Sequence, residues 1–169
     1  MILAGLARRI MLIRLKSDAN MQMMKIMDRI RGLSRYAANI ADGLISMREA
    51  HDVPTDLFCR QMQFANAANA MAYNTACQQM QFMQPMMQAN LQTMPPEMQQ
   101  QYMNNQFMMF YQEARKQAAV EEQRVLHQQE EELKEEQERL KVLIAEYDEE
   151  LKSLDQASKD DIKSFFSHA

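Results

Sequence analysis

The sequence predicts an all-α protein: an extended helical hairpin, or three long helices with coiled-coil segments, and a short C-terminal helix. Its 169 residues include only three glycines and four prolines, so long stretches contain no residue that would end a helix. Ala, Gln, Met, Glu and Leu, which favour helices, are abundant. No window alternates apolar and polar residues with the period of two that is typical of strands.

Residues 1–50 are predicted to form a basic helical segment that ends near Ala50. Its main signal is an apolar heptad pattern made of two rows offset by three residues. The rows are Met23, Ile30, Ala37, Leu44 and Ile26, Leu33, Ile40, Met47. A further apolar row upstream is out of phase with them: Leu3, Leu6, Ile10, Ile13. Either a second helix restarts at residues 17–18, or one helix runs through with a stutter.

Residues 55–95 are predicted to form an uncharged helix, because no charged side chain occurs from Gln61 to Pro96. Thr55 or Asp56 is expected to cap it, and Pro85 to kink or interrupt it. Asn and Gln occupy positions where a surface helix usually carries charge. Amides cost less to bury than ions and can satisfy one another, so other protein could surround this helix. We therefore predict an assembly interface here, the alternative being a single-chain core with a neutral surface.

Residues 96–156 are predicted to form a long helix that becomes an acidic coiled coil. After the Pro95–Pro96 break, five apolar residues repeat every seven positions: Leu126, Leu133, Leu140, Tyr147 and Leu154. The Glu-rich run 130–138 is interpreted as a solvated face with Glu130–Lys134 and Glu135–Arg139 pairs.

Residues 158–169 are predicted to form a short apolar helix that starts in a capping box at Ser158. Ile162, Phe165 and Phe166 would either cap the long helix or dock into a neighbouring subunit.

Charge is distributed unevenly along the chain. Residues 1–60 carry ten basic and six acidic side chains, whereas residues 121–169 carry seven basic and fifteen acidic ones. This asymmetry favours pairing of the two ends, within one chain or between chains. The acidic total, a formal net charge of −4, argues against a nucleic-acid partner.

No catalytic motif or Cys/His metal spacing occurs, so neither an enzyme nor a cofactor is expected. Met80, Met83 and Met86 have the spacing of a Cu(I) site, or could line a groove for varied apolar peptides, but methionines at helical spacing more often pack. Cys59 and Cys77 are expected to be reduced.

The first sixteen residues are apolar and basic but lack a signal-peptide cleavage site. They are expected to form a helix that meets a partner, and membrane contact through residues 1–16 is the alternative. The expected location is cytoplasmic, or exported without a classical signal peptide, with a mitochondrial location as a third alternative.

The sequence therefore predicts a structural subunit that self-assembles or docks into a larger complex. Its alternatives are an exported filament or translocator subunit of a bacterial secretion system, and a peripheral subunit of a membrane or organelle complex. The partners are further copies of the chain, other subunits, or both. The predicted interface residues are Ile26, Ile30, Leu33, Ile40, Met80, Met83, Met86, Met87, Leu133, Leu140, Leu154, Ile162, Phe165 and Phe166.

Overall fold

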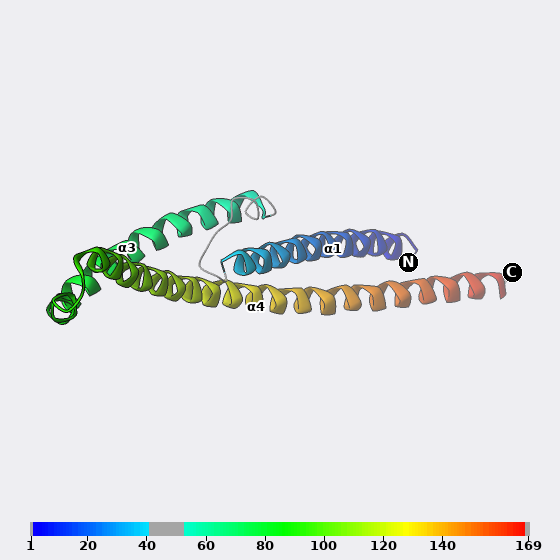
Figure 1. The fold of residues 1–169 in the computed structure, drawn as a ribbon. Helices are drawn as coiled ribbons and strands as arrows, with labels where there is room; N and C mark the ends of the chain where they lie inside the picture. The colour runs from blue at the N-terminus through cyan, green and yellow to red at the C-terminus, as the bar shows by residue number, and fades with distance from the viewer. Residues whose placement is uncertain (1, 41–52, 168–169) are drawn as a thin grey trace. The chain divides into compact units, whose positions relative to one another are not determined.

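The computed structural model describes residues 2–40 and 53–167, and these form three long helices (Figure 1). The helices are α1 (Ile2–Asn39), α3 (Thr55–Leu91) and α4 (Pro96–Ser167). The described residues contain no strand, which confirms the predicted all-α fold. The chain divides into two compact units. Unit 1 comprises residues 1–31 and 130–169, and unit 2 comprises residues 32–129.

One predicted helix boundary is wrong, and one of the two effects expected of Pro85, an interruption of the helix, does not occur. The long third helix does not stop near Leu154, because α4 continues to Ser167 without a separate C-terminal helix. Residues 154–158 contain no Gly or Pro, so extending an existing helix is easier than nucleating a new one at Ser158. Likewise, α3 continues through Pro85 without interruption. The predicted end of the first helix near residue 50 lies outside the described residues.

Unit 1 is an antiparallel pairing of α1 and α4. Arg8 lies beside Glu150, whereas Ile26 packs in one cluster with Leu140. Ala19 completes the buried part of this cluster. Five partly buried side chains pack around it: Met23, Ile30, Leu133, Leu143 and Ile144. Described members of both predicted heptad rows therefore pack against one another within the chain.

The buried row of α1 also extends upstream of the predicted pattern. Leu12 and Ala19 precede Ile26 at seven-residue spacing, and all three are buried. The helix therefore has neither a restart nor a stutter, and the described members of the predicted upstream row are not part of the core. Three members of that row are exposed: Leu6, Ile10 and Ile13.

Unit 2 contains an antiparallel hairpin of α3 and α4, joined by a short turn over residues 92–95. The Gln99 side chain stabilises this turn, because its amide nitrogen donates to the carbonyl oxygens of Leu91, at 2.9 Å, and Met94, at 3.1 Å. The last turns of α1 and the residue after it complete the core with three fully buried side chains: Leu33 and Tyr36 of α1, and Ile40. Gly32 permits close contact there, because a Cβ at this position would lie 2.9 Å from Leu57 Cδ1.

Candidate assembly surfaces

The interior of the α3–α4 hairpin is lined by small side chains. Ala68, Ala72 and Ala76 of α3 are buried, as is Ala119 of α4. Because alanine adds only a methyl group, a stripe of such residues lets two helices approach closely. This packing determines which face of α3 is turned inward; Leu57 and Met87 are buried with it, whereas several other long apolar residues remain on the helix surface.

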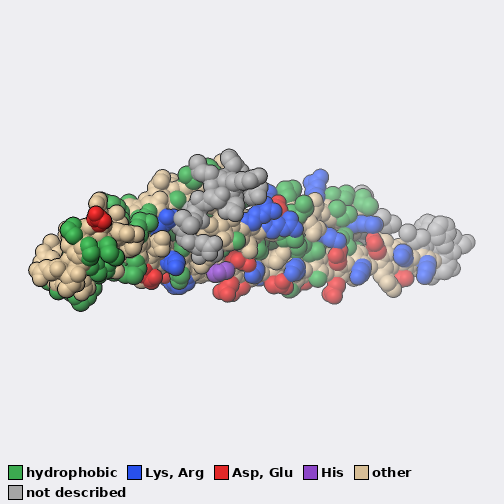
Figure 2. Space-filling view, viewed as in Figure 1, with side chains coloured by type: hydrophobic (Ala, Val, Ile, Leu, Met, Phe, Trp, Pro, Cys, Tyr) green, Lys and Arg blue, Asp and Glu red, His purple; other side chains and the backbone are tan. Residues whose placement is uncertain are grey.

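Those longer residues lie on an uncharged surface that we call the neutral hairpin, residues 61–112. Glu97 is the only charged residue in this range. Phe82 is 86% exposed, and six further large side chains are exposed with it: Met71, Tyr73, Met86, Met98, Met108 and Met109. Figure 2 shows that the side chains at this end of the α3–α4 pair are mostly hydrophobic or uncharged polar. Exposed apolar residues gathered on a surface almost without charge are typical of an interaction site.

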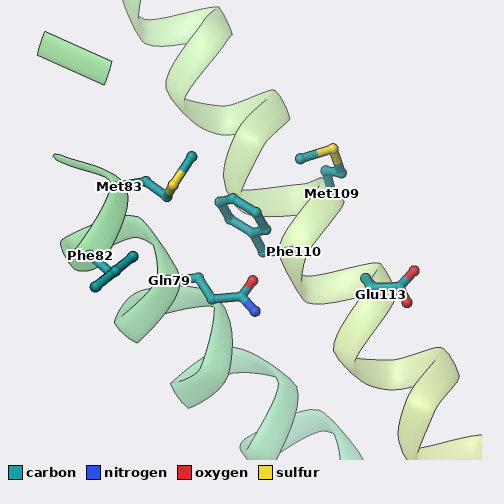
Figure 3. Close-up of a pocket in the computed structure, with 6 residues that line it drawn as sticks. All are labelled: Gln79, Phe82, Met83, Met109, Phe110 and Glu113. Carbon is teal, nitrogen blue, oxygen red and sulfur yellow. The ribbon is translucent and has the colours of Figure 1, made fainter. Parts of the chain in front are cut away.

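A groove of about 490 Å³ lies between α3 and α4 within the neutral hairpin and is lined at one end by Glu113 (Figure 3). Met83 and Phe110 are half-buried and project from the two helices into the space between them. Gln79 reaches from α3 towards α4. The exposed Phe82 and Met109 also line the groove. The groove thus offers an apolar floor with an exposed aromatic side chain beside it.

A polar network lies in unit 2 on the α1 side of the neutral hairpin. The Tyr36 hydroxyl donates to Glu122 Oε1 at 2.9 Å, and Arg60 Nε donates to the same oxygen at 2.9 Å. Arg60 Nη1 also donates to Gln129 Oε1 at 2.8 Å. Burial, followed by the charge of Glu122 and its hydrogen bond, raises the pKa of Tyr36 well above its ordinary value, because each disfavours the phenolate. The network therefore holds Tyr36 as a neutral donor.

Gln61 is a second buried polar group, one turn of α3 after Leu57. Its side chain is fully buried, and neither its amide oxygen nor its amide nitrogen has a hydrogen-bond partner. A buried amide without partners destabilises a fold by about 1–3 kcal/mol. The unpaired amide of Gln61 therefore lowers the stability of unit 2, and it lies where the uncharged segment begins.

In unit 1, ion pairs join the basic N-terminal part of α1 to acidic residues of α4. Arg8 binds Glu150 at 3.3 Å, Arg9 binds Asp155 at 3.1 Å, and Lys16 binds Asp148. The predicted pairing of the two chain ends therefore occurs within one chain. The two predicted pairs along α4 are also confirmed: Glu130–Lys134 at 2.6 Å and Glu135–Arg139 at 4.0 Å.

The predicted interface residues fall into four groups. Ile26, Leu33, Ile40, Leu140 and Met87 are buried within the chain. Ile30, Leu133, Leu154, Met80 and Met83 are half-buried. Met86 is exposed on the neutral hairpin. Ile162, Phe165 and Phe166 belong to α4, and their side chains are outside what the structure describes.

Sequence reasoning missed the groove residues Phe82, Met109 and Phe110. A usable signal was present, because the alanine row at 68, 72 and 76 marks the buried face of α3. Phe82 follows Ala72, the centre of the row, by ten residues, which places it about 80° from the centre of that face at 100° per residue. An aromatic residue held off the buried face by a small-residue row is a candidate contact.

Within the described residues, no group of three His, Cys, Asp or Glu side chains could hold a metal ion. No helix of the described chain is both long and apolar enough to cross a bilayer. No family model, curated protein or solved structure matches the chain.

Proposed function

We propose that the protein is a structural subunit of a protein assembly, joined to its neighbours through the neutral hairpin. The observation that carries this proposal is the exposed apolar surface around Phe82, in a stretch whose only charge is Glu97. A solvated surface gains nothing from replacing charges with amides and methionines. A surface covered by protein does gain, because uncharged groups are less costly to remove from water.

The balance of buried and exposed residues supports the same proposal. In the described chain, sixteen apolar residues are buried, and six of these are alanines. Seventeen large hydrophobic residues are exposed. Methionine, which is frequent among the exposed residues, adapts its shape to irregular contacts. A chain that exposes more large apolar side chains than it buries is suited to being covered by further protein.

The ion pairs of unit 1 oppose the membrane-bound alternative only weakly, because their side chains are substantially exposed. Binding to an anionic bilayer draws on basic side chains that are free to meet lipid headgroups. Arg8, Arg9 and Lys16 instead neutralise carboxylates of α4. Membrane binding through residues 1–16 would have to compete with these pairs.

The test is sedimentation velocity across a hundredfold range of protein concentration, at low and moderate salt. We expect species that grow with concentration and persist at moderate salt, because an uncharged apolar contact is not screened by ions. A monomer at every concentration would overturn self-assembly. In that case pull-down from the native source would test whether a different protein occupies the surface.

A further inference from the structure

We propose that the groove between α3 and α4 binds a second copy of this chain, with Phe82 of each copy inserted into the groove of the other. This inference rests on the proposed function, since it specifies the contact through which the subunit self-associates. Such a contact needs an exposed side chain that inserts, which we call the donor, and a groove that receives it. It also needs chemistry that favours a second copy over another partner, and an arrangement in which both copies engage at once.

Phe82 is the donor side chain. It is 86% exposed, and it is the most exposed of the large hydrophobic residues that the structure describes. A phenyl ring loses only two side-chain torsions when it is fixed, so it provides much apolar contact area at low entropic cost. Aromatic side chains that fill a pocket in a partner commonly dominate the binding energy of an interface.

The receiving groove has the size and lining that such a ring requires. Its volume is about 490 Å³, within the usual range of about 300–1,000 Å³ for binding pockets. Met83 and Phe110 form a floor of thioether and aromatic groups between the helices (Figure 3). Phenyl rings pack favourably against both: sulfur contacts the ring edge, and aromatic pairs adopt offset or edge-to-face geometry.

Charge favours a second copy over a charged partner. Glu97 is the only charged residue between residues 61 and 112 that could pair with a charge on a partner. Glu113 is the only charged residue that lines the groove. A partner helix with a charged face would therefore bury ions without counter-charges. The same surface on another copy brings one charge to the groove, its own Glu113, and otherwise avoids this cost. Its amides complement one another, because each both donates and accepts hydrogen bonds.

Donor and groove lie on one surface, which permits a two-fold arrangement. Phe82 lines its own groove while remaining almost fully exposed. In a two-fold contact each copy presents the same patch, so one axis beside residue 82 would insert both rings at once. Met86 lies one helical turn further along α3 and is 58% exposed, so it would extend the contact.

The first test compares two substitutions in the full chain by sedimentation velocity: Phe82→Gln and the control Val120→Gln. Val120 is an exposed apolar residue of α4 outside the neutral hairpin. We expect Phe82→Gln to weaken self-association at least about thirtyfold, the loss typical of a dominant interface residue, and Val120→Gln to leave it unchanged. Circular dichroism should show equal helix content for both variants, because both positions are exposed.

The outcomes separate this inference from the proposed function. If the wild type associates and Phe82→Gln associates equally well, the Phe82 contact is wrong and the assembly function stands. If Phe82→Gln and Val120→Gln weaken association equally, the loss is not specific to the groove and the contact is again wrong. If the wild type is monomeric throughout, the contact between two copies is wrong, and the pull-down from the native source then decides whether the assembly function stands with a different partner.

The second test locates the contact directly. The photocrosslinker p-benzoylphenylalanine replaces Phe82 in ¹⁵N-labelled chains, which are then mixed with unlabelled wild-type chains. After irradiation, mass spectrometry should find labelled-to-unlabelled crosslinks to peptides that contain Met83, Met109 or Phe110. Crosslinks only within labelled chains, or only to other regions of the partner copy, would overturn the two-fold arrangement.

Discussion

Units 1 and 2 are both helix pairings, but they use opposite chemistry. Unit 1 packs Ile26 and Leu140 between α1 and α4, and ion pairs such as Arg9–Asp155 join the same two helices nearer the N-terminus of α1. Unit 2 buries an alanine stripe together with large residues such as Leu33 and Tyr36, and its residues 61–112 carry a single charge, Glu97. Both units expose large apolar residues, but those of unit 1 lie among charged side chains, whereas those of the neutral hairpin lie among amides. The two units therefore differ in the charge around their exposed apolar residues rather than in how many of these residues they expose.

The largest expected effect comes from placing a charge in the core of unit 1. Ile26→Asp would bury a carboxylate among Ala19 and Leu140, without a partner in that apolar cluster. We expect unfolding or a loss of about 3–5 kcal/mol. Met24→Asp is the control, since Met24 is exposed on the same helix and should cost less than about 0.5 kcal/mol. Urea denaturation followed by circular dichroism measures both, and equal losses would show that the assigned core face is wrong.

A smaller loss is expected from breaking the polar network of unit 2. Glu122→Leu would remove the acceptor shared by Tyr36 and Arg60 and leave both donors without that partner. We expect a loss of about 2 kcal/mol, because the site is partly rather than fully buried. Glu121→Leu provides the control, since Glu121 is exposed beside it and pairs only locally with Arg124. Denaturant titration measures the free energy of unfolding of both variants. If both lose the same amount, the network makes no specific contribution to stability.

The same network predicts a pH dependence. Burial and Glu122 raise the pKa of Tyr36 in the folded state above the ordinary tyrosine value of about 10. The unfolded chain therefore releases this proton first, so the contribution of Tyr36 is complete below pH about 10 and is lost as the pH rises further. The slope should approach about 1.4 kcal/mol per pH unit. The stability difference between wild type and Tyr36→Phe should shrink from pH about 9 to about 11, and parallel curves would refute the assignment.

Much of the secondary structure could be predicted from local patterns. The heptad rows correctly indicated that Ile26, Leu33 and Ile40 share the buried face of the first helix. Local spacing also predicted the Glu130–Lys134 pair, because both partners lie on one helix. These features depend on the period of a single helix, which the sequence contains directly.

The tertiary contacts could not be predicted in the same way. Arg60 and Glu122 are separated by 62 residues, and only the antiparallel packing of α3 and α4 brings them together. The groove depends on the rotation of α3, which the alanine stripe determines once its packing against α4 is known. The extension of α4 to Ser167 was missed because the capping pattern at Ser158 is also compatible with the interior of a helix.

A stabilising substitution tests whether unit 2 is the less optimised part of the molecule. Gln61→Met removes a fully buried amide that has no hydrogen-bond partner and replaces it with an apolar side chain of similar length. We expect a gain of about 1 kcal/mol in the free energy of unfolding. Gln63→Met, at an exposed position two residues later, should change it by less than about 0.5 kcal/mol. A loss of stability in Gln61→Met would mean that the amide makes a favourable contact in solution.

The smallest expected effect concerns the ion pairs of unit 1. Arg9 and Asp155 lie 3.1 Å apart, but both side chains are nearly half exposed. Water and salt therefore screen their attraction, and a double-mutant cycle of Arg9→Gln and Asp155→Asn should give a coupling below about 1 kcal/mol that shrinks as salt is added. A coupling of several kcal/mol that resists salt would show that these pairs, rather than the Ile26 cluster, stabilise unit 1. The two units would then differ in stability because of their charges and not because of their apolar cores. The expected coupling below about 1 kcal/mol instead means that apolar packing stabilises unit 1, and that its ion pairs mainly align α1 with α4.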